Sequence, residues 1–99
     1  MPDDIYYPRE DSELLAEALK QTGIKGKNVL EVGCGSGLLS IIMAKSGALV
    51  AAVDINPAAV ETTNQNAAKN NVKVKAFVSD MFENVRGTFD LIVFNPPYL

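Results

Sequence analysis

Hydrophobic and polar positions along this 99-residue chain change between two spacings. Short apolar runs typical of buried strands alternate with stretches in which apolar residues recur every three or four positions, as on one face of a helix. The pattern predicts three helices and four strands. The helices are expected at 11–22, from 38 to the residue before Gly47, and at 57–70; the strands are expected at 28–32, 49–53, 72–78 and 90–94.

Local signals support several of these boundaries. Asp11 or Ser12 can cap the first helix, and Gly23 stands where a left-handed residue ends it. Asn56 followed by Pro57 is typical of an N-cap and a first helical residue. The third helix therefore has a start that local chemistry specifies.

The order of the elements predicts the fold class. Strands and helices alternate with short links, which indicates right-handed βαβ units and a parallel sheet of the α/β class. Ligands of such sheets bind at the carboxyl ends of strands, near the point where the strand order switches. Polar residues stand at the predicted carboxyl ends of all four strands, namely Glu31, Asp54, Asp80 and Asn95. We therefore expect these residues to line one crevice.

The link after the first strand has glycine at every second position, as Gly33, Gly35 and Gly37. Glycine allows a positive φ and lets a ligand approach without meeting a Cβ, so the turn presents the amides of a helix N-terminus. The spacing differs from G-x-G-x-x-G, the fingerprint that binds a pyrophosphate, and Glu31 precedes the first glycine by two positions. A carboxylate there favours a cationic or amine-bearing nucleotide-like ligand. A tight turn without a ligand is the alternative.

Two further acids follow the second and third strands. Asp54 is placed to accept hydrogen bonds from both ribose hydroxyls of a nucleoside. The alternative for Asp54 is a helix cap, although Asn56 already fills that role. Asp80 and Met81 follow the third strand; an N-cap and simple packing are their alternatives. With the glycine loop, these acids favour a nucleoside ligand.

Asn95-Pro96-Pro97-Tyr98 is the tetrapeptide that bears most directly on chemistry. Two consecutive prolines fix φ and remove two N–H donors, so the loop is stiff and its carbonyls point outward. The Asn95 side-chain oxygen and the Pro96 carbonyl make a pair of acceptors for a planar NH₂ group, and Tyr98 offers a flat face for stacking. A proline-rich strand exit is the alternative, which the glycine loop upstream disfavours.

Composition narrows the function classes. The chain is 47% hydrophobic and 21% charged, which fits a globular domain. One cysteine and no histidine argue against a zinc site or a histidine-based triad, so no metal is expected, and a lone cysteine fits a reducing, cytoplasmic setting. The net charge of −3 disfavours unassisted binding to nucleic acid, and no apolar run approaches the ~18 residues of a membrane span.

Three stretches of the sequence resemble parts of known enzymes. The acid followed by alternating glycines is similar to the S-adenosylmethionine (SAM) loop of the class I methyltransferases, whose fold is Rossmann-like. The run at 90–98 (DLIVFNPPY) is similar to the fourth strand and catalytic loop of those class I enzymes that methylate the amide of glutamine, N6 of adenine or N2 of guanine. Residues 6–15 (YYPREDSELL) are similar to the start of the HemK-type glutamine methyltransferases, closest to the archaeal and eukaryotic branch that modifies the Gly-Gly-Gln of class I release factors.

The resemblance implies roles for particular residues. The residues expected to bind the cofactor SAM are Ser12, Glu31, Gly33, Cys34, Gly35, Gly37, Asp54, Ile55, Asp80, Met81 and Asn95. The residues expected to be catalytic are Asn95, Pro96, Pro97 and Tyr98. Asn95 Oδ1 and the Pro96 carbonyl would accept the two N–H hydrogens of the target during in-line methyl transfer. The implied function is N-methylation, in its most specific form of the glutamine side chain of a release factor.

The resemblance also implies a larger fold and partners. A class I methyltransferase sheet has seven strands, and this sequence supplies the first four, in the expected spatial order 3-2-1-4. Residues 1–99 are therefore expected to be the N-terminal part of a single SAM-binding domain that lacks strands 5–7, and the activity of the chain alone is left open. The expected partners are a release factor as protein substrate, and either a small zinc-ribbon activator subunit or a chain that completes the sheet.

Three other functions stay open from the sequence. A methyltransferase acting on adenine or guanine is disfavoured by the acidic charge balance. A non-catalytic SAM-binding module is favoured by the missing strands and disfavoured by the complete Asn95–Tyr98 motif. A NAD-linked dehydrogenase is disfavoured by the glycine spacing and by Glu31.

Overall fold

The computed structural model of the chain describes residues 23–95. Six elements lie in this range, and they follow the predicted order of strand and helix. They are β1 (Asn28–Val32), α2 (Leu38–Lys45), β2 (Leu49–Asp54), α3 (Pro57–Lys69), β3 (Val74–Val78) and β4 (Leu91–Phe94). The predicted helix at 11–22 lies outside the described residues, as do Ser12, Pro96, Pro97 and Tyr98.

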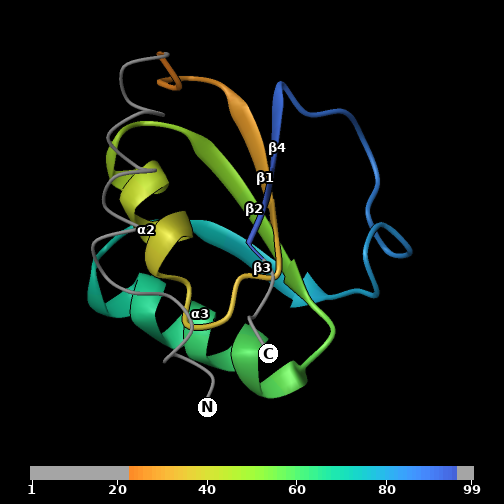
Figure 1. The fold of residues 1–99 in the computed structure, drawn as a ribbon. Coiled ribbons are helices and arrows are strands. Elements are labelled where there is room, and N and C mark those ends of the chain that lie inside the picture. The colour runs from red at the N-terminus through yellow and green to blue at the C-terminus, as the bar shows by residue number, and fades with distance from the viewer. Residues whose placement is uncertain (1–22, 96–99) are drawn as a thin grey trace.

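The four strands form one parallel sheet in the order β3-β2-β1-β4. The α/β fold and the strand order predicted from the sequence are therefore confirmed. β1 lies between β2 and β4, and its pairing aligns Val32 with Val53 on one side and with Phe94 on the other. Because all strands are parallel, the residues that follow them emerge at the same edge of the sheet (Figure 1).

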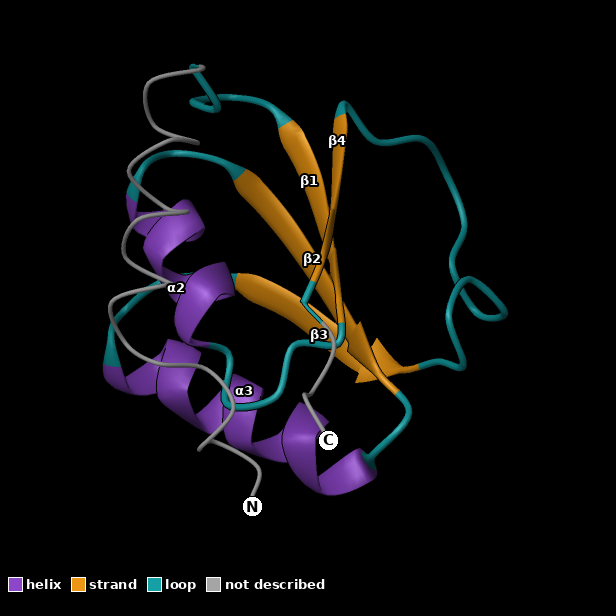
Figure 2. Cartoon of the chain, viewed as in Figure 1, coloured by secondary structure: helices purple, strands orange, loops and turns teal. Residues whose placement is uncertain are grey.

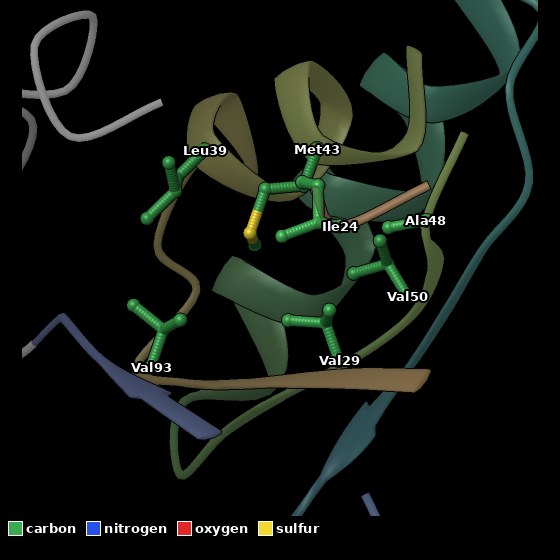
Figure 3. Close-up of a cluster of buried hydrophobic side chains, with 7 residues drawn as sticks. All are labelled: Ile24, Val29, Leu39, Met43, Ala48, Val50 and Val93. Atoms are coloured by element: carbon green, nitrogen blue, oxygen red, sulfur yellow. The ribbon is translucent and has the colours of Figure 1, made fainter. Parts of the chain in front are cut away.

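Helices α2 and α3 cover one face of this sheet, as Figures 1 and 2 show. The core on that face gathers residues of α2, the three strands β1, β2 and β4, and the loops at their ends: Ile24, Val29, Leu39, Met43, Ala48, Val50 and Val93. Figure 3 shows Leu39 and Met43 of α2 above Val29 of β1 and Val93 of β4. Burial of this apolar surface supplies the main favourable free energy of the fold.

The opposite face carries a smaller core. Leu30, Val32 and Val53 are buried there, and Val85 and Phe89 of the long loop between β3 and β4 pack against them. Figure 2 shows this loop on the side of the sheet away from the two helices. No described helix covers the outer face of β4, where Ile92 and Phe94 are 42% and 53% exposed. The fourth strand therefore exposes two large apolar side chains on this face.

The ends of both helices explain where the next strands begin. In α2, the N–H of Ala48 donates to the Met43 carbonyl across Gly47, whose φ is 97°. In α3, the N–H of Val72 donates to the Ala67 carbonyl across Asn71, which adopts a left-handed φ of 57°. The predicted strand at 72–78 was therefore too long at its start, because Val72 belongs to the helix cap and β3 begins at Val74.

Gly37 fits the fold only as glycine, and this gives a prediction. Its φ is +87°, and an added Cβ would lie 2.8 Å from Thr63 Cγ2. For Gly37→Ala we expect a loss of free energy of unfolding of ~1–2 kcal/mol for the left-handed backbone and a further ~1–3 kcal/mol for overpacking. Urea denaturation followed by circular dichroism would measure the sum.

Gly87→Ala is the matched control for this variant. Its φ of +93° is similar, but an added Cβ would meet no atom within 4 Å. Only the backbone cost of ~1–2 kcal/mol is expected there. Equal losses in the two variants would show that the contact with Thr63 has no energetic effect.

Candidate functional site

The glycine loop joins β1 to α2 and has the backbone that its sequence predicts. Gly33, Gly35 and Gly37 have φ values of 89°, 56° and 87°. The N–H groups of Gly33 and Cys34 both donate to the carbonyl of Val53 on β2, at 2.8 and 3.1 Å. The loop is thereby anchored to the neighbouring strand, and Gly37 caps the start of α2.

Two side chains of α3 hold the loop from outside. The fully buried Thr63 donates through Oγ1 to the Gly35 carbonyl at 3.1 Å and to Cys34 Sγ at 3.3 Å. Asn66 Nδ2 donates to the Ser36 carbonyl at 2.9 Å. The sequence pattern places Thr63 on the buried face of α3 but assigns no role to either residue. A polar threonine among apolar residues on that helix face was the one sequence feature that could have indicated a contact with the loop.

Cys34 is a buried residue of this loop. Its side chain is 2% exposed, and burial raises the pKa of the thiol to about 12. The thiol therefore stays protonated at neutral pH and has none of the nucleophilic character of a thiolate. Contact between Cys34 and a cofactor stays a prediction.

Asp54 ties the end of β2 to the glycine loop. Its Oδ2 accepts from the N–H of Gly35 at 3.0 Å, and its Oδ1 accepts from the N–H of Asn56 at 2.9 Å. Asn56 itself caps α3, because its Oδ1 accepts from the N–H of Ala58. Asn56 is therefore the helix cap, as predicted, and Asp54 is a half-buried carboxylate at the edge of the loop. A carboxylate has about four acceptor positions, so these two bonds leave capacity for ligand hydroxyls.

Glu31 is the most deeply buried polar group of the site. It lies on β1, on the face covered by α2, and has no exposed surface. Ser40 Oγ donates to Glu31 Oε1 at 2.5 Å, and Asn95 Nδ2 donates to Glu31 Oε2 at 2.8 Å. Burial raises the pKa of Glu31 to about 7, opposed by the hydrogen bonds from Ser40 and Asn95. The expected acid is therefore an internal bridge between α2 and the end of β4. Ser40 has no role in the sequence prediction.

Asn95 is the first residue after β4 and is half-buried. Its backbone N–H donates to the Val32 carbonyl at 2.9 Å, which extends the pairing of β4 with β1 by one residue. When Glu31 is ionised, its carboxylate can only accept hydrogen bonds, so the nitrogen edge of the Asn95 amide faces it. The side chain expected to be catalytic is thus oriented by the ionised acid of the first strand.

The turn after β3 provides the third acid. The N–H of Ser79 donates to the Asp54 carbonyl, which keeps the ends of β3 and β2 together. Buried Ser79 Oγ bonds to the carbonyl of Met81 and the N–H of Asn84, so it shapes the turn in which Asp80 is exposed. Ser79, like Ser40, was missed by the sequence prediction.

The groups at this edge of the sheet fit a nucleoside. Asp54 and Asp80 are acceptors for hydroxyl or amino hydrogens. Ile55 directly follows Asp54 and Met81 directly follows Asp80, and these two apolar residues are 66% and 48% exposed. Large apolar side chains beside carboxylates suit a planar base whose edge is polar. No three His, Cys, Asp or Glu side chains among residues 23–95 are grouped as a metal site would require.

Comparison with known proteins assigns this arrangement to a family. The sequence profile of the methyltransferase small domain matches residues 10–99, which is most of the chain. The chain belongs to this family. Within residues 23–95, no helix of this methyltransferase small domain is long and apolar enough to cross a membrane.

Two curated relatives match nearly the whole of this chain. The "Putative protein N5-glutamine methyltransferase MJ0928" of Methanocaldococcus jannaschii is 54% identical over 97% of this chain and 48% of its own length. Methyltransferase HEMK2 of Mus musculus is 39% identical over 97% of this chain and 50% of its own length. The chain therefore spans about half the length of these two relatives.

A solved structure supports the same fold. The 16S rRNA N2 G1207 methyltransferase RsmC of T. thermophilus, in complex with AdoMet and guanosine, has a TM-score of 0.82 and 36% sequence identity. The match covers 89% of this chain and 25% of RsmC. The Rossmann-like methyltransferase fold inferred from the sequence is confirmed.

The raised pKa of Glu31 predicts how stability changes with pH. The ordinary value is 4.5 and the folded value is about 7, so the folded protein binds more protons than the unfolded chain between these pH values. The free energy of unfolding should fall as pH rises from about 4.5, by about 3 kcal/mol in total once pH exceeds about 7. Urea denaturation at about pH 5 and about pH 8 would measure this loss.

Glu31→Gln is the control for this pH dependence. The amide does not ionise, so the variant should lose the fall between the two pH values. A fall of the same size in Glu31→Gln would assign the effect to another group.

Proposed function

We propose that this chain binds SAM and supplies the catalytic asparagine of an N-methyltransferase whose target is the glutamine side chain of a class I release factor. The observation that carries the proposal is the Glu31–Asn95 hydrogen bond, which fixes a side-chain amide at the edge of the sheet where the nucleoside-binding groups gather. The name of the M. jannaschii relative, "Putative protein N5-glutamine methyltransferase MJ0928", supports glutamine as the target, and the Mus musculus relative is named as a methyltransferase.

The described residues have the chemistry that SAM requires. Asp54 would accept from the ribose hydroxyls, Asp80 from the adenine amino group, and Ile55 and Met81 would contact the base. The amides of the glycine loop add donors at the start of α2. When bound, SAM supplies the electrophilic methyl group on its sulfonium.

Asn95 would act by gripping the target nitrogen. Its Oδ1 and the Pro96 carbonyl would each accept one N–H hydrogen of the glutamine amide, which directs the nitrogen lone pair toward the methyl group. Orientation of this kind can lower a barrier by ~7–11 kcal/mol when the geometry is near attack. Each acceptor contributes a further ~1.5–3 kcal/mol as the nitrogen gains positive charge. The methylated nitrogen would then release one of its N–H protons to water, because it is strongly acidic while it carries positive charge. No histidine is needed as a base for this step, and the chain has none.

Methylation of a nucleobase amine is the second candidate. The similarity to RsmC, whose structure contains guanosine, favours it. The net charge of −3 opposes it, because binding to a phosphate backbone relies on lysine and arginine. A non-catalytic SAM-binding module is a third candidate, which the anchored Asn95 disfavours.

Asn95→Ala is expected to abolish methyl transfer and to leave SAM affinity nearly unchanged. The variant removes an acceptor for the target nitrogen and one of the eleven residues implied to bind SAM, but none of the groups assigned to ribose or base. Transfer of labelled methyl groups measures the first effect, and isothermal titration calorimetry measures the second. Asn64→Ala, on the exposed surface of α3, is the control that should retain both. Lost SAM affinity in Asn95→Ala would contradict the assigned role.

The choice of substrate can be tested directly. A peptide containing Gly-Gly-Gln and an oligonucleotide containing unpaired adenine and guanine would be offered separately to the chain with SAM. Mass spectrometry is expected to find one added methyl group on the glutamine of the peptide. Methylation of the oligonucleotide alone would replace the release-factor assignment with the nucleobase one. Methylation of neither, with SAM bound, would support the non-catalytic module.

A further inference from the structure

We propose that Ser40 is a positioning residue, whose hydroxyl acts through the Glu31 carboxylate to set the orientation of the Asn95 side-chain amide. The inference rests on the proposed function, because it concerns the amide assigned to grip the target nitrogen. Ser40 itself would touch neither the cofactor nor the substrate.

The three side chains form one continuous hydrogen-bonded path. Ser40 Oγ on α2 donates to Glu31 Oε1, and Asn95 Nδ2 after β4 donates to Glu31 Oε2. Ser40 and Glu31 are fully buried, so no water competes for this carboxylate at the Ser40 end. The path connects a helix, the central strand and the last residue before the proline loop.

Ser40 stands in an otherwise apolar helix. Its neighbours in α2 are leucine, isoleucine, methionine and alanine, with Lys45 at the exposed end. A buried hydroxyl is unfavourable unless it is hydrogen bonded. Alanine would fit this position and favour the helix more, so the serine is explained by the bond to Glu31 rather than by packing or helix propensity.

The protonation state of Glu31 decides which edge of Asn95 faces inward. The ionised carboxylate accepts from Nδ2, as observed. A protonated Glu31 would carry an O–H, and its best partner would be the Asn95 amide oxygen. Protonation would therefore turn the amide over and withdraw from the target the oxygen that the proposed grip requires.

Ser40 shifts this balance toward the ionised form. A hydrogen bond to the charged form lowers a pKa, and the bond from Ser40 is the largest effect opposing the rise that burial causes in the pKa of Glu31. The charged or titratable groups around Glu31 are Asp54 at the end of β2, which raises its pKa further, and the Cys34 thiol, which stays neutral. Within the described residues, α2 and β4 bring no charged side chain to it.

The test compares Ser40→Ala with Ser46→Ala. Ser46 lies at the end of the same helix and donates to the Ile42 carbonyl, away from Glu31, so it controls for the loss of a hydroxyl. Carbon-13 NMR of the Glu31 carboxyl and nitrogen-15 NMR of the Asn95 side-chain amide would be followed against pH in the full 99-residue chain.

In the wild type, both signals should change with one midpoint near pH 7. In Ser40→Ala, the common midpoint should move up by ~1–2 pH units, which is the loss of a hydrogen bond to a charged group expressed as a pKa shift. Ser46→Ala should leave the midpoint in place. Ser40→Thr, which keeps the hydroxyl, should restore most of the wild-type behaviour. Ser40→Cys keeps a side chain of similar size but has a weaker donor, so its midpoint should lie above that of the wild type by less than ~1–2 pH units. This variant tests the inference even if Ser40→Ala does not fold.

Methyl transfer to the Gly-Gly-Gln peptide gives the functional readout. The kcat should rise with pH at the NMR midpoint in each variant, while the KM for SAM stays constant. A Glu31 midpoint or Asn95 signal that is unchanged in the Ser40 variants would overturn the inference, whether or not the wild type is active. Coupled NMR shifts without transfer by the wild type would support the positioning path and count against the proposed function.

Discussion

A carboxylate buried in the central strand is the constraint on which the candidate site depends. Glu31 has no exposed surface, and a buried charge is costly unless it is hydrogen bonded. The fold supplies a donor from each side, Ser40 from α2 and Asn95 after β4. Both elements must therefore keep one position relative to β1. The same requirement holds the asparagine before the proline loop at the edge where the glycine loop lies.

The glycine loop is held by a separate set of contacts. Asp54 and the Val53 carbonyl bind its backbone from β2, while Thr63 and Asn66 bind it from α3. Left-handed backbone at glycine is cheap but entropically costly to order, so these side chains define a shape that glycine alone would not. Among residues 23–95, the loop and the asparagine thus have different side-chain supports, which are connected through β1 and through α2, the helix that begins after Gly37.

The relatives show why the substrate is harder to assign than the family. The M. jannaschii relative is named as a glutamine methyltransferase, and RsmC is named as a methyltransferase of N2 of G1207 in 16S rRNA. Both align with this chain, which spans only 48% of the first and 25% of the second. The match to the first covers 97% of this chain, including the strand ends assigned to the nucleoside and the asparagine assigned to the target. A planar amide and a nucleobase amine present the same two N–H hydrogens to such an acceptor, so this part of the fold does not separate them.

The sequence by itself determined the six elements of residues 23–95, their parallel sheet and most of the groups at its carboxyl edge. Apolar periodicity, the alternating glycines and the Asn56-Pro57 cap are local signals, and local geometry follows from them. Only the tertiary structure decided the partners of Glu31. Ser40 lies 9 residues from it and Asn95 lies 64 residues away, and no periodicity pairs them. The start of β3 depended likewise on Val72 closing the preceding helix. Contacts between side chains of different elements depend on how those elements pack together in three dimensions. Such packing involves residues far apart in the chain, so no single stretch of sequence specifies it.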